Sequence, residues 1–223
     1  PIDSIDQLKI NIKTKAKTDE KERDEYLKDN SRYNKIPVKI IPGIENVLSN
    51  KKNYLIHGIA TSGKTTILKK IGKDFLNLSG TNDLLLFFEL NKLFEKGKEL
   101  SLERYVIDYL SNLNISEKHL IEADRILLLL DGLDEINDTT TKDYIIEEIE
   151  KFKKYPKLKV VISSRTNDYV TKTDKVKEIF DSFELLPLSF NEVIKLGELV
   201  LGKDETTTKS FIKLMKSSEL AKV

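Results

Sequence analysis

Five short apolar runs recur along the middle of the chain, each bounded by glycine or polar residues. They are too short for ordinary helices and lack the apolar–polar alternation of half-exposed strands, so we expect strands that are buried on both faces. The expected strands cover residues 54–56, 84–88, 126–130, 158–163 and 183–186.

Between these runs, apolar residues recur every three to four positions, which is the spacing of amphipathic helices. Helices are expected over residues 44–50, 64–78 and 141–154, from residue 101, from residue 191 and from about residue 206. Strands that alternate with helices indicate a parallel sheet covered on both faces. The predicted fold is therefore a three-layer α/β/α arrangement with a five-stranded, mostly parallel sheet.

The two ends of the chain differ from this core. Residues 1–35 are dominated by charged and amide side chains, and we interpret them as a charged linker or N-terminal helical segment. Residues 36–187 are expected to form the α/β core, and residues 188–223 the start of a small helical subdomain. Because the sequence opens at Pro1 and stops within a helical pattern at Val223, we expect a fragment of a longer protein.

The segment GIATSGKTT lies between the first expected strand and the first long helix, which is the context that a phosphate-binding loop requires. Its two glycines permit a tight turn that brings backbone N–H groups onto phosphate oxygens at the positive end of the helix. Lys64 is expected to reach the β- and γ-phosphates, and the Thr65 hydroxyl to bind Mg²⁺. A chance glycine-containing turn is the alternative. The expected nucleotide-binding residues are Gly58, Ile59, Ala60, Thr61, Ser62, Gly63, Lys64, Thr65 and Thr66.

A group of acids follows the third expected strand. Asp131 stands at the carboxyl end of that strand, where open α/β sheets bind ligands, and one carboxylate there can help to hold Mg²⁺. Gly132 permits close approach, and Asp134 or Glu135 could polarise the water that attacks a γ-phosphate. A loop of helix-capping acids is the alternative.

Arg165 ends the fourth expected strand, after two serines, and could contact the same γ-phosphate. An ordinary surface salt bridge is the alternative. The predicted catalytic group is thus Lys64, Asp134, Glu135 and Arg165, with Thr65 and Asp131 as metal ligands.

The composition bears on nucleic-acid binding, cysteine chemistry and membrane insertion. The formal charge of +1 gives no general basic excess for nucleic-acid binding, and the absence of cysteine excludes disulfides and thiolate metal sites. No apolar run approaches the roughly 18 residues of a membrane span, so we expect a cytoplasmic protein with no membrane partner.

His57 is interpreted as a packed strand-end residue. The lysines at 151, 153, 154, 157 and 159 are interpreted as a solvated helix end, and Phe94 departs from the guanine-reading Asn-Lys-x-Asp pattern that begins at Asn91.

The pieces GIATSGKTT, LLLFFELNKL, ILLLLDGLDE and VVISSRT, in this order and spacing, resemble the NACHT branch of the STAND P-loop NTPases, which have an ASCE-type fold. Related AAA+ ATPases place the second acid directly after the metal-binding aspartate. NACHT domains place a small residue there and the acid further on, as Gly132 and Asp134 are placed here. The resemblance covers about residues 36–200, and FELLPLSFNEVIKL resembles the family's exit into its helical subdomain.

This resemblance implies roles for the same residues. The loop at 58–66 corresponds to Walker A, Asp131 to the Walker B magnesium aspartate, Asp134 to the catalytic acid with Glu135 as a helper, and Arg165 to the sensor arginine. The sensor strand is expected between the two Walker strands, and the adenine pocket near residues 36–44. The implied cofactors are ATP or ADP and Mg²⁺.

The resemblance also implies an ATP-driven switch that is ADP-bound at rest and oligomeric with ATP, with effector and sensor domains in the same protein. Many bacterial and animal members act in defence or programmed death. The chain stops before the winged-helix region and sensor histidine of many relatives. Three alternatives stay open: a nucleotide-binding scaffold without turnover, another AAA+-like ATPase, and a small-molecule kinase, which the absence of arginine after Arg165 disfavours.

Overall fold

The computed structural model describes residues 13–15, 39–40, 44–78, 80, 82–94, 101–166, 173–186 and 205–217. The chain divides into two compact units, residues 42–184 and residues 1–41 with 185–223. The predicted helix from residue 191 and most of the predicted adenine-binding segment lie outside the described residues. The predicted domain boundaries at residues 35 and 187 stay predictions.

The core of the larger unit is the predicted sheet. Five successive strands run in the order β7-β3-β6-β5-β4, and the pairs β3–β6, β6–β5 and β5–β4 are parallel. β7 begins three residues earlier than predicted, because the polar Asp181 and Ser182 interrupt its apolar run. The strands are β3 (Asn53–Gly58), β4 (Asp83–Glu89), β5 (Arg125–Asp131), β6 (Leu158–Arg165) and β7 (Phe180–Leu185).

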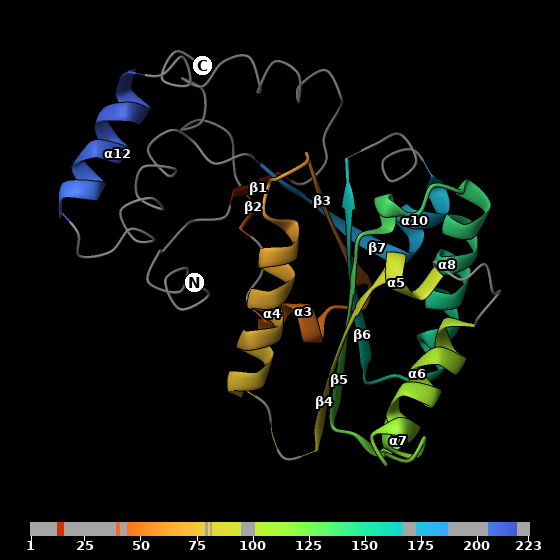
Figure 1. Ribbon diagram of the computed structural model, residues 1–223. Helices are drawn as coiled ribbons and strands as arrows, with labels where there is room; N and C mark the ends of the chain where they lie inside the picture. The colour runs from red at the N-terminus through yellow and green to blue at the C-terminus, as the bar shows by residue number, and fades with distance from the viewer. Residues whose placement is uncertain are drawn as a thin grey trace. The chain divides into compact units, whose positions relative to one another are not determined.

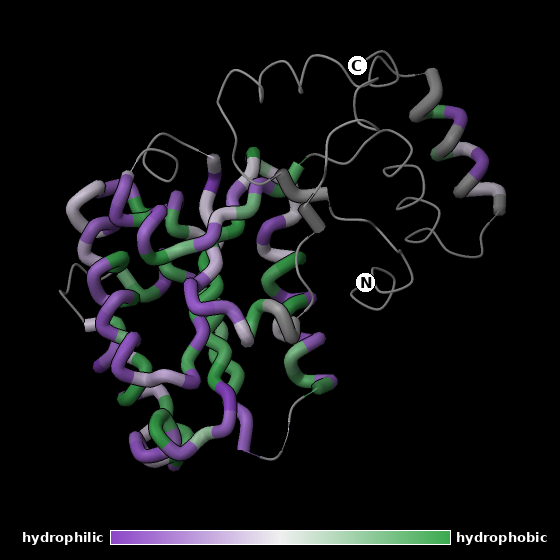
Figure 2. Tube along the Cα trace, turned by 180° about the vertical axis from the view of Figure 1, so that it is seen from behind, coloured by the Kyte–Doolittle hydropathy of each residue, from purple (hydrophilic) through white to green (hydrophobic). Residues whose placement is uncertain are grey.

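Helices cover both faces of this sheet, which confirms the three-layer α/β prediction (Figure 1). One face carries α3 (Ile44–Ser49) and α4 (Lys64–Leu78). The other carries α5 (Leu90–Phe94), α6 (Leu102–Asn112), α7 (His119–Glu122), α8 (Thr139–Lys151) and α10 (Asp174–Ile179). Figure 2 shows the apolar strands at the centre and polar residues spread over the outer helices.

The continuous apolar run of β5 follows from burial on both sides. Leu128 and Leu130 belong to the core beneath α6 and α8, and successive strand residues point to opposite faces. Leu129 therefore faces α4. A Cβ added to Gly72 of that helix would lie 3.1 Å from the Leu129 Cδ1 atom. Gly72 allows α4 to approach the sheet closely.

Side-chain caps set the start of two helices. α6 begins where it was predicted, because the Ser101 hydroxyl caps it by accepting a hydrogen bond from the Arg104 N–H at 3.4 Å. α8 begins two residues before its prediction, because Asp138 accepts from the Thr141 N–H at 2.7 Å. Its C-terminal turn, Phe152–Lys154, is a 3₁₀ helix. The short helices α5, α7 and α10 were not predicted.

In the smaller unit, β1 (Lys13–Lys15) and β2 (Lys39–Ile40) pair antiparallel. Helix α12 (Glu205–Ser217) agrees with the prediction of a helix from about residue 206. Across the described ranges of both units, none of the helices has the length and apolarity to span a bilayer.

The interpretation of Lys159 as part of a solvated helix end was wrong. Lys159 lies on β6 and is 9% exposed, and its Nζ donates to the carbonyl oxygens of Asn50 at 2.5 Å and Lys52 at 3.2 Å. The other four lysines of the cluster form ion pairs with nearby acids. The position of Lys159 inside a strand, between apolar neighbours, was the signal for its burial.

Candidate nucleotide site

The loop between β3 and α4 presents backbone N–H groups at the start of a helix. The first intrahelical bond of this turn runs from the Ile67 N–H to the Gly63 carbonyl at 2.9 Å. The N–H groups of residues 64–66 therefore have no acceptor inside the helix and point outward from its positive end. Gly63 has φ +91°, which favours glycine although a Cβ would meet nothing within 4 Å. Thr61 also has a positive φ, of 62°.

A cleft of about 260 Å³ joins this loop to the ends of β5 and β6. Its lining includes every residue predicted as catalytic or metal-binding, so the structure brings both halves of the predicted site together. The lining residues are Ala60, Thr61, Gly63, Lys64, Thr65, Asp131, Gly132, Asp134, Glu135, Ser163 and Arg165.

Sheet register explains this assembly. β6 lies between β3 and β5, as the resemblance implied, and Gly58 is level with Arg165. The Thr166 N–H donates to the Gly58 carbonyl at 3.1 Å, and the Thr166 Oγ1 lies 3.0 Å from the His57 Nδ1. His57 is 1% exposed, which agrees with a packed strand-end residue.

The Lys64 ammonium lies within the loop that precedes it. Its Nζ donates to the carbonyl oxygens of Gly58 at 3.2 Å and Ile59 at 2.8 Å. Burial lowers the pKa of Lys64, the positive charge of Arg165 lowers it further, and the carboxylates of Asp134 and Asp131 oppose the shift. These contacts hold a positive charge at the cleft with neutral acceptors, so the ammonium can turn to an anionic ligand.

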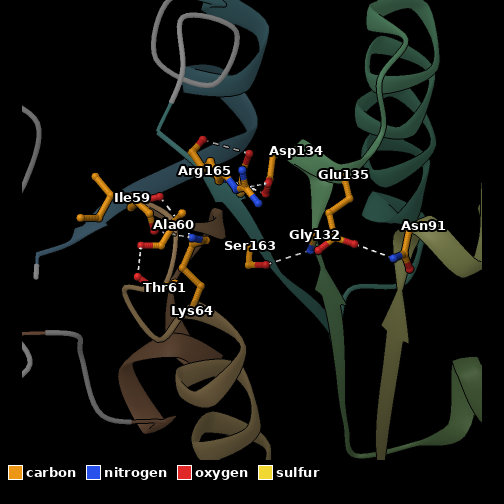
Figure 3. Close-up of polar contacts among 12 residues, drawn as sticks. Ile59, Ala60, Thr61, Lys64, Asn91, Gly132, Asp134, Glu135, Ser163 and Arg165 are labelled. Carbon is orange, nitrogen blue, oxygen red and sulfur yellow. Dashed lines mark hydrogen bonds and ion pairs between the residues drawn. The ribbon is translucent and has the colours of Figure 1, made fainter.

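The turn after β5 is shaped by Gly132. Its φ is +87°, and a Cβ there would lie 3.1 Å from the Glu135 Cδ atom, so both backbone and space favour glycine. The Gly132 N–H donates to the Ser163 Oγ at 2.9 Å, and the Ser163 hydroxyl donates to the Asp131 Oδ1. Ser163 thus fixes Asp131 at the strand end, and its bond with Gly132 is shown in Figure 3.

Asp134 and Arg165 contact each other. The Arg165 Nε lies 2.9 Å from the Asp134 Oδ2, and the Arg165 N–H donates to the Asp134 Oδ1 at 2.8 Å (Figure 3). The Asp134 side chain is 10% exposed and that of Arg165 is 60% exposed. The two residues therefore form a salt bridge in the cleft lining, where Arg165 keeps access to a ligand.

Glu135 has a different partner, Asn91. The Asn91 Nδ2 donates to the Glu135 Oε2 at 2.5 Å, and among the described residues the buried Asn91 Oδ1 has no hydrogen-bond partner. Neither Asn91 nor Ser163 was predicted as a site residue. Both stand at or just after the carboxyl end of a predicted strand, and that position was the signal that would have found them.

The oxygen donors of this cleft fit Mg²⁺ held together with a nucleotide. No group of three His, Cys, Asp or Glu side chains able to hold a metal occurs in the part of the chain that the structure describes. Mg²⁺ prefers a few protein oxygens plus water and phosphate, which matches the single carboxylate of Asp131 and the hydroxyl of Thr65. The loop also contains a buried hydroxyl without a partner among the described residues, the Ser62 Oγ.

Comparison with known proteins decides the family. A sequence model of the NACHT domain matches residues 52–199, which is most of the chain. The chain belongs to the NACHT domain family. The NACHT domain is a P-loop NTPase domain, so the predicted family and the P-loop fold are confirmed. No match is found among curated proteins.

Three solved structures are similar to this NACHT domain. A replication initiator DnaA bound to AMPPCP and single-stranded DNA matches with a TM-score of 0.52 at 15% identity, over 81% of this chain and 55% of that one. Domain III of DnaA from Thermotoga maritima matches with a TM-score of 0.46 at 15% identity, over 71% and 65% of the two chains. A DNA replication initiation factor matches with a TM-score of 0.45 at 15% identity, over 90% and 62%. The NACHT chain thus spans little more than half of the first of these proteins.

Proposed function

We propose that this NACHT domain binds Mg²⁺–ATP in the cleft, hydrolyses it slowly and works as a molecular switch. One observation carries the proposal: Lys64, Thr65 and Asp131, from two different strand ends, line a single cleft. A lysine, a hydroxyl and a carboxylate in this arrangement supply a cation for the phosphates and two oxygens for magnesium.

The residues of the chain divide the work of binding. The outward N–H groups of α4 bind phosphate oxygens, and Lys64 exchanges its loop carbonyls for the β- and γ-phosphates. Thr65 and Asp131 hold the magnesium, which when bound neutralises charge on the phosphates.

Hydrolysis involves a rearrangement of the salt bridge. The Arg165 backbone N–H donates to one oxygen of Asp134 and the guanidinium contacts the other, so freeing this second oxygen makes it a better acceptor for a water proton. The exposed Arg165 guanidinium can turn to the γ-phosphate, because phosphate oxygens accept strong, charge-assisted hydrogen bonds from arginine. Asp134 is then available to orient the attacking water, with Glu135 beside it. Exchange of the Arg165 partner links the nucleotide state to the conformation of the cleft.

The wider behaviour is proposed from family membership. ADP occupies the resting state, exchange for ATP permits homo-oligomerisation, and effector and sensor domains belong to the same protein. We propose a role in defence or signalling in the cytoplasm, with no membrane or nucleic-acid partner for this domain.

The test is to identify the nucleotide that co-purifies with the domain by mass spectrometry, and then to measure steady-state ATPase activity together with light scattering. We expect adenine nucleotide, slow Mg²⁺-dependent turnover, and larger particles with a non-hydrolysable ATP analogue than with ADP. A different bound base, or ATP affinity too weak to measure, would overturn the nucleotide assignment. Unchanged particle size would remove the oligomerisation step alone.

A second candidate is a scaffold that holds nucleotide without turnover, and the occupied oxygens of Asp134 favour it. Turnover measured for wild type and for Arg165→Ala separates the two candidates. For a scaffold, neither wild type nor variant hydrolyses ATP. For the switch, wild type turns over ATP and the variant loses the link between γ-phosphate and Asp134, so its turnover changes while ADP binding does not.

A further inference from the structure

Ser163 is a buried serine at the carboxyl end of β6, between the strand that leads into the phosphate loop and the strand that ends in Asp131. Its exposed fraction is 1%, and it is level with Ile56 of β3. A buried hydroxyl is costly unless it is hydrogen-bonded. Here it makes two hydrogen bonds, one to Asp131 at the end of β5 and one to Gly132 in the turn that follows.

The direction of these bonds follows from the chemistry of a hydroxyl. The Gly132 N–H can only donate, so the Ser163 Oγ accepts this bond at 2.9 Å. The single hydroxyl proton is then free for the other partner, and a carboxylate only accepts. Ser163 therefore donates to the Asp131 Oδ1, and a bond to an ionised acceptor is stronger than a neutral one.

These two bonds fix the turn and the carboxylate together. With the Asp131 Oδ1 held by Ser163, the plane of the carboxylate is set and the Oδ2 is the oxygen left for a ligand. Asp131 and Ser163 both line the cleft, as does Thr65. We propose that Ser163 is a positioning residue for the magnesium of the nucleotide: it aims Asp131 at the ion without binding the ion itself. The inference rests on the proposed function, because it needs a magnesium nucleotide in the cleft.

The next residue supplies a matched control. Ser164 is also buried, at 0% exposed, but it points to the opposite face of the sheet and does not line the cleft. Its hydroxyl donates to the adjacent Arg165 carbonyl at 3.2 Å. Ser164→Ala thus removes the same atom from the same strand, one residue away, without touching Asp131.

The experiment titrates Mg²⁺ into the domain with a fluorescent ATP analogue and also measures the analogue's affinity in EDTA. For Ser163→Ala we expect the Mg²⁺ concentration for half-maximal binding to rise about tenfold or more, which is typical when a group that orients a metal ligand is removed. Affinity in EDTA should stay within about twofold, since the phosphate loop is intact. Ser164→Ala should match wild type, and Ser163→Thr, which keeps the hydroxyl, should restore the Mg²⁺ response.

Thermal unfolding of each variant shows which ones are folded. If the alanine variant does not fold, Ser163→Cys replaces it. Cysteine has a similar volume but only a weak S–H donor, so we expect the Mg²⁺ concentration for half-maximal binding to rise above that of wild type, by less than the tenfold expected for alanine. An unchanged Mg²⁺ response in the folded Ser163 variants, or an equal loss in Ser164→Ala, would overturn the inference. If wild type itself bound the analogue equally well with and without Mg²⁺, the magnesium site of the proposed function would be wrong, and the role of Ser163 with it.

Discussion

Strands β4 and β5 carry charged residues at both ends, and the two ends are built differently. At the amino end, Asp83 is level with Arg125, and at the carboxyl end, Glu89 is level with Asp131. Opposite charges on neighbouring strands stabilise a sheet, and like charges destabilise it. The same pair of strands therefore begins with two opposite charges and ends with two like charges.

The amino end satisfies its charges internally. The Asp83 side chain is 1% exposed and accepts from the Arg125 Nη2 at 2.5 Å and the Gly80 N–H at 2.7 Å. The Arg125 guanidinium also donates to the Leu78 carbonyl at 2.7 Å and lies 5.6 Å from the centre of the Phe75 ring. Each charged group has a protein partner, so this end contributes to stability.

The carboxyl end leaves part of its charge for a ligand. Asp131 is held by the neutral hydroxyl of Ser163 and Glu135 by the neutral amide of Asn91, while Glu89 pairs with the exposed Lys92. Across the cleft, Lys64 contacts carbonyl oxygens. Acids held by neutral donors, opposite a lysine, suit a ligand that brings both negative charge and a divalent cation. The difference indicates that the carboxyl end is arranged for binding rather than for stability.

The largest expected effect comes from removing the lysine of the carboxyl end. Lys64→Ala should weaken Mg²⁺–ATP binding by roughly 30-fold to several thousandfold and abolish turnover, because loss of a charged partner costs about 2–5 kcal/mol. Calorimetry measures the affinity. Lys70→Ala, on the same helix and paired with Asp74 at its surface, should bind as wild type does. Unchanged affinity in Lys64→Ala would show that the site lies elsewhere.

The next effect separates the two acids of the turn. Asp134→Ala should keep ATP affinity but lower turnover at least about 100-fold, since a positioned base contributes this much or more. The assay is single-turnover hydrolysis, with Glu135→Gln beside it. Normal turnover in Asp134→Ala and a large loss in Glu135→Gln would move the role of orienting water to Glu135 and its partner Asn91.

At the amino end the expected effect is on stability alone. Asp83→Asn should lower the free energy of unfolding by about 2–3 kcal/mol, because the hydrogen bonds to the Arg125 guanidinium lose their charge. Urea unfolding measures it, and ATP affinity should not change. Asp74→Asn, in a half-exposed pair, should shift stability by less than about 1 kcal/mol.

Asp83 also makes the stability of the fold depend on pH, with a defined sign. Hydrogen bonding to Arg125 lowers the pKa of Asp83 below its ordinary value of 3.8. A carboxyl with a depressed pKa in the fold contributes stability above its unfolded pKa, and that contribution is lost as the pH falls through the folded pKa. Wild type should therefore lose more stability below pH 3.8 than Asp83→Asn does. Parallel pH curves for the two proteins would contradict the role of the pair.

The sequence predicted the sheet, α4 and the cleft because each depends on a pattern along the chain. The apolar run before Asp131 and the loop before Lys64 both place their polar residues at strand ends, and parallel topology brings those ends together. Partners set by side-chain geometry could not be predicted in this way. The bonds from Ser163 to Asp131, from Arg165 to Asp134 and from Asn91 to Glu135 join residues far apart in the chain.

The smallest expected effect is a gain in stability, opposite in sign to the loss expected for Asp83→Asn. It tests the comparison of the two strand ends most directly. Asp131→Asn removes one of the two like charges at the carboxyl end, while the amide oxygen can still accept from Ser163. If that end is arranged for binding, removal of the like charge should outweigh the loss of charge on the Ser163 bond, and stability should rise by a few tenths of a kcal/mol, the scale of a cross-strand charge pair. The Mg²⁺ requirement for ATP binding should rise at the same time. Urea unfolding and a Mg²⁺ titration of the same preparation measure both, with Asp83→Asn as the mirror case that loses stability and keeps its Mg²⁺ response. A loss of stability in Asp131→Asn would show that Asp131 has an internal structural role like that of Asp83.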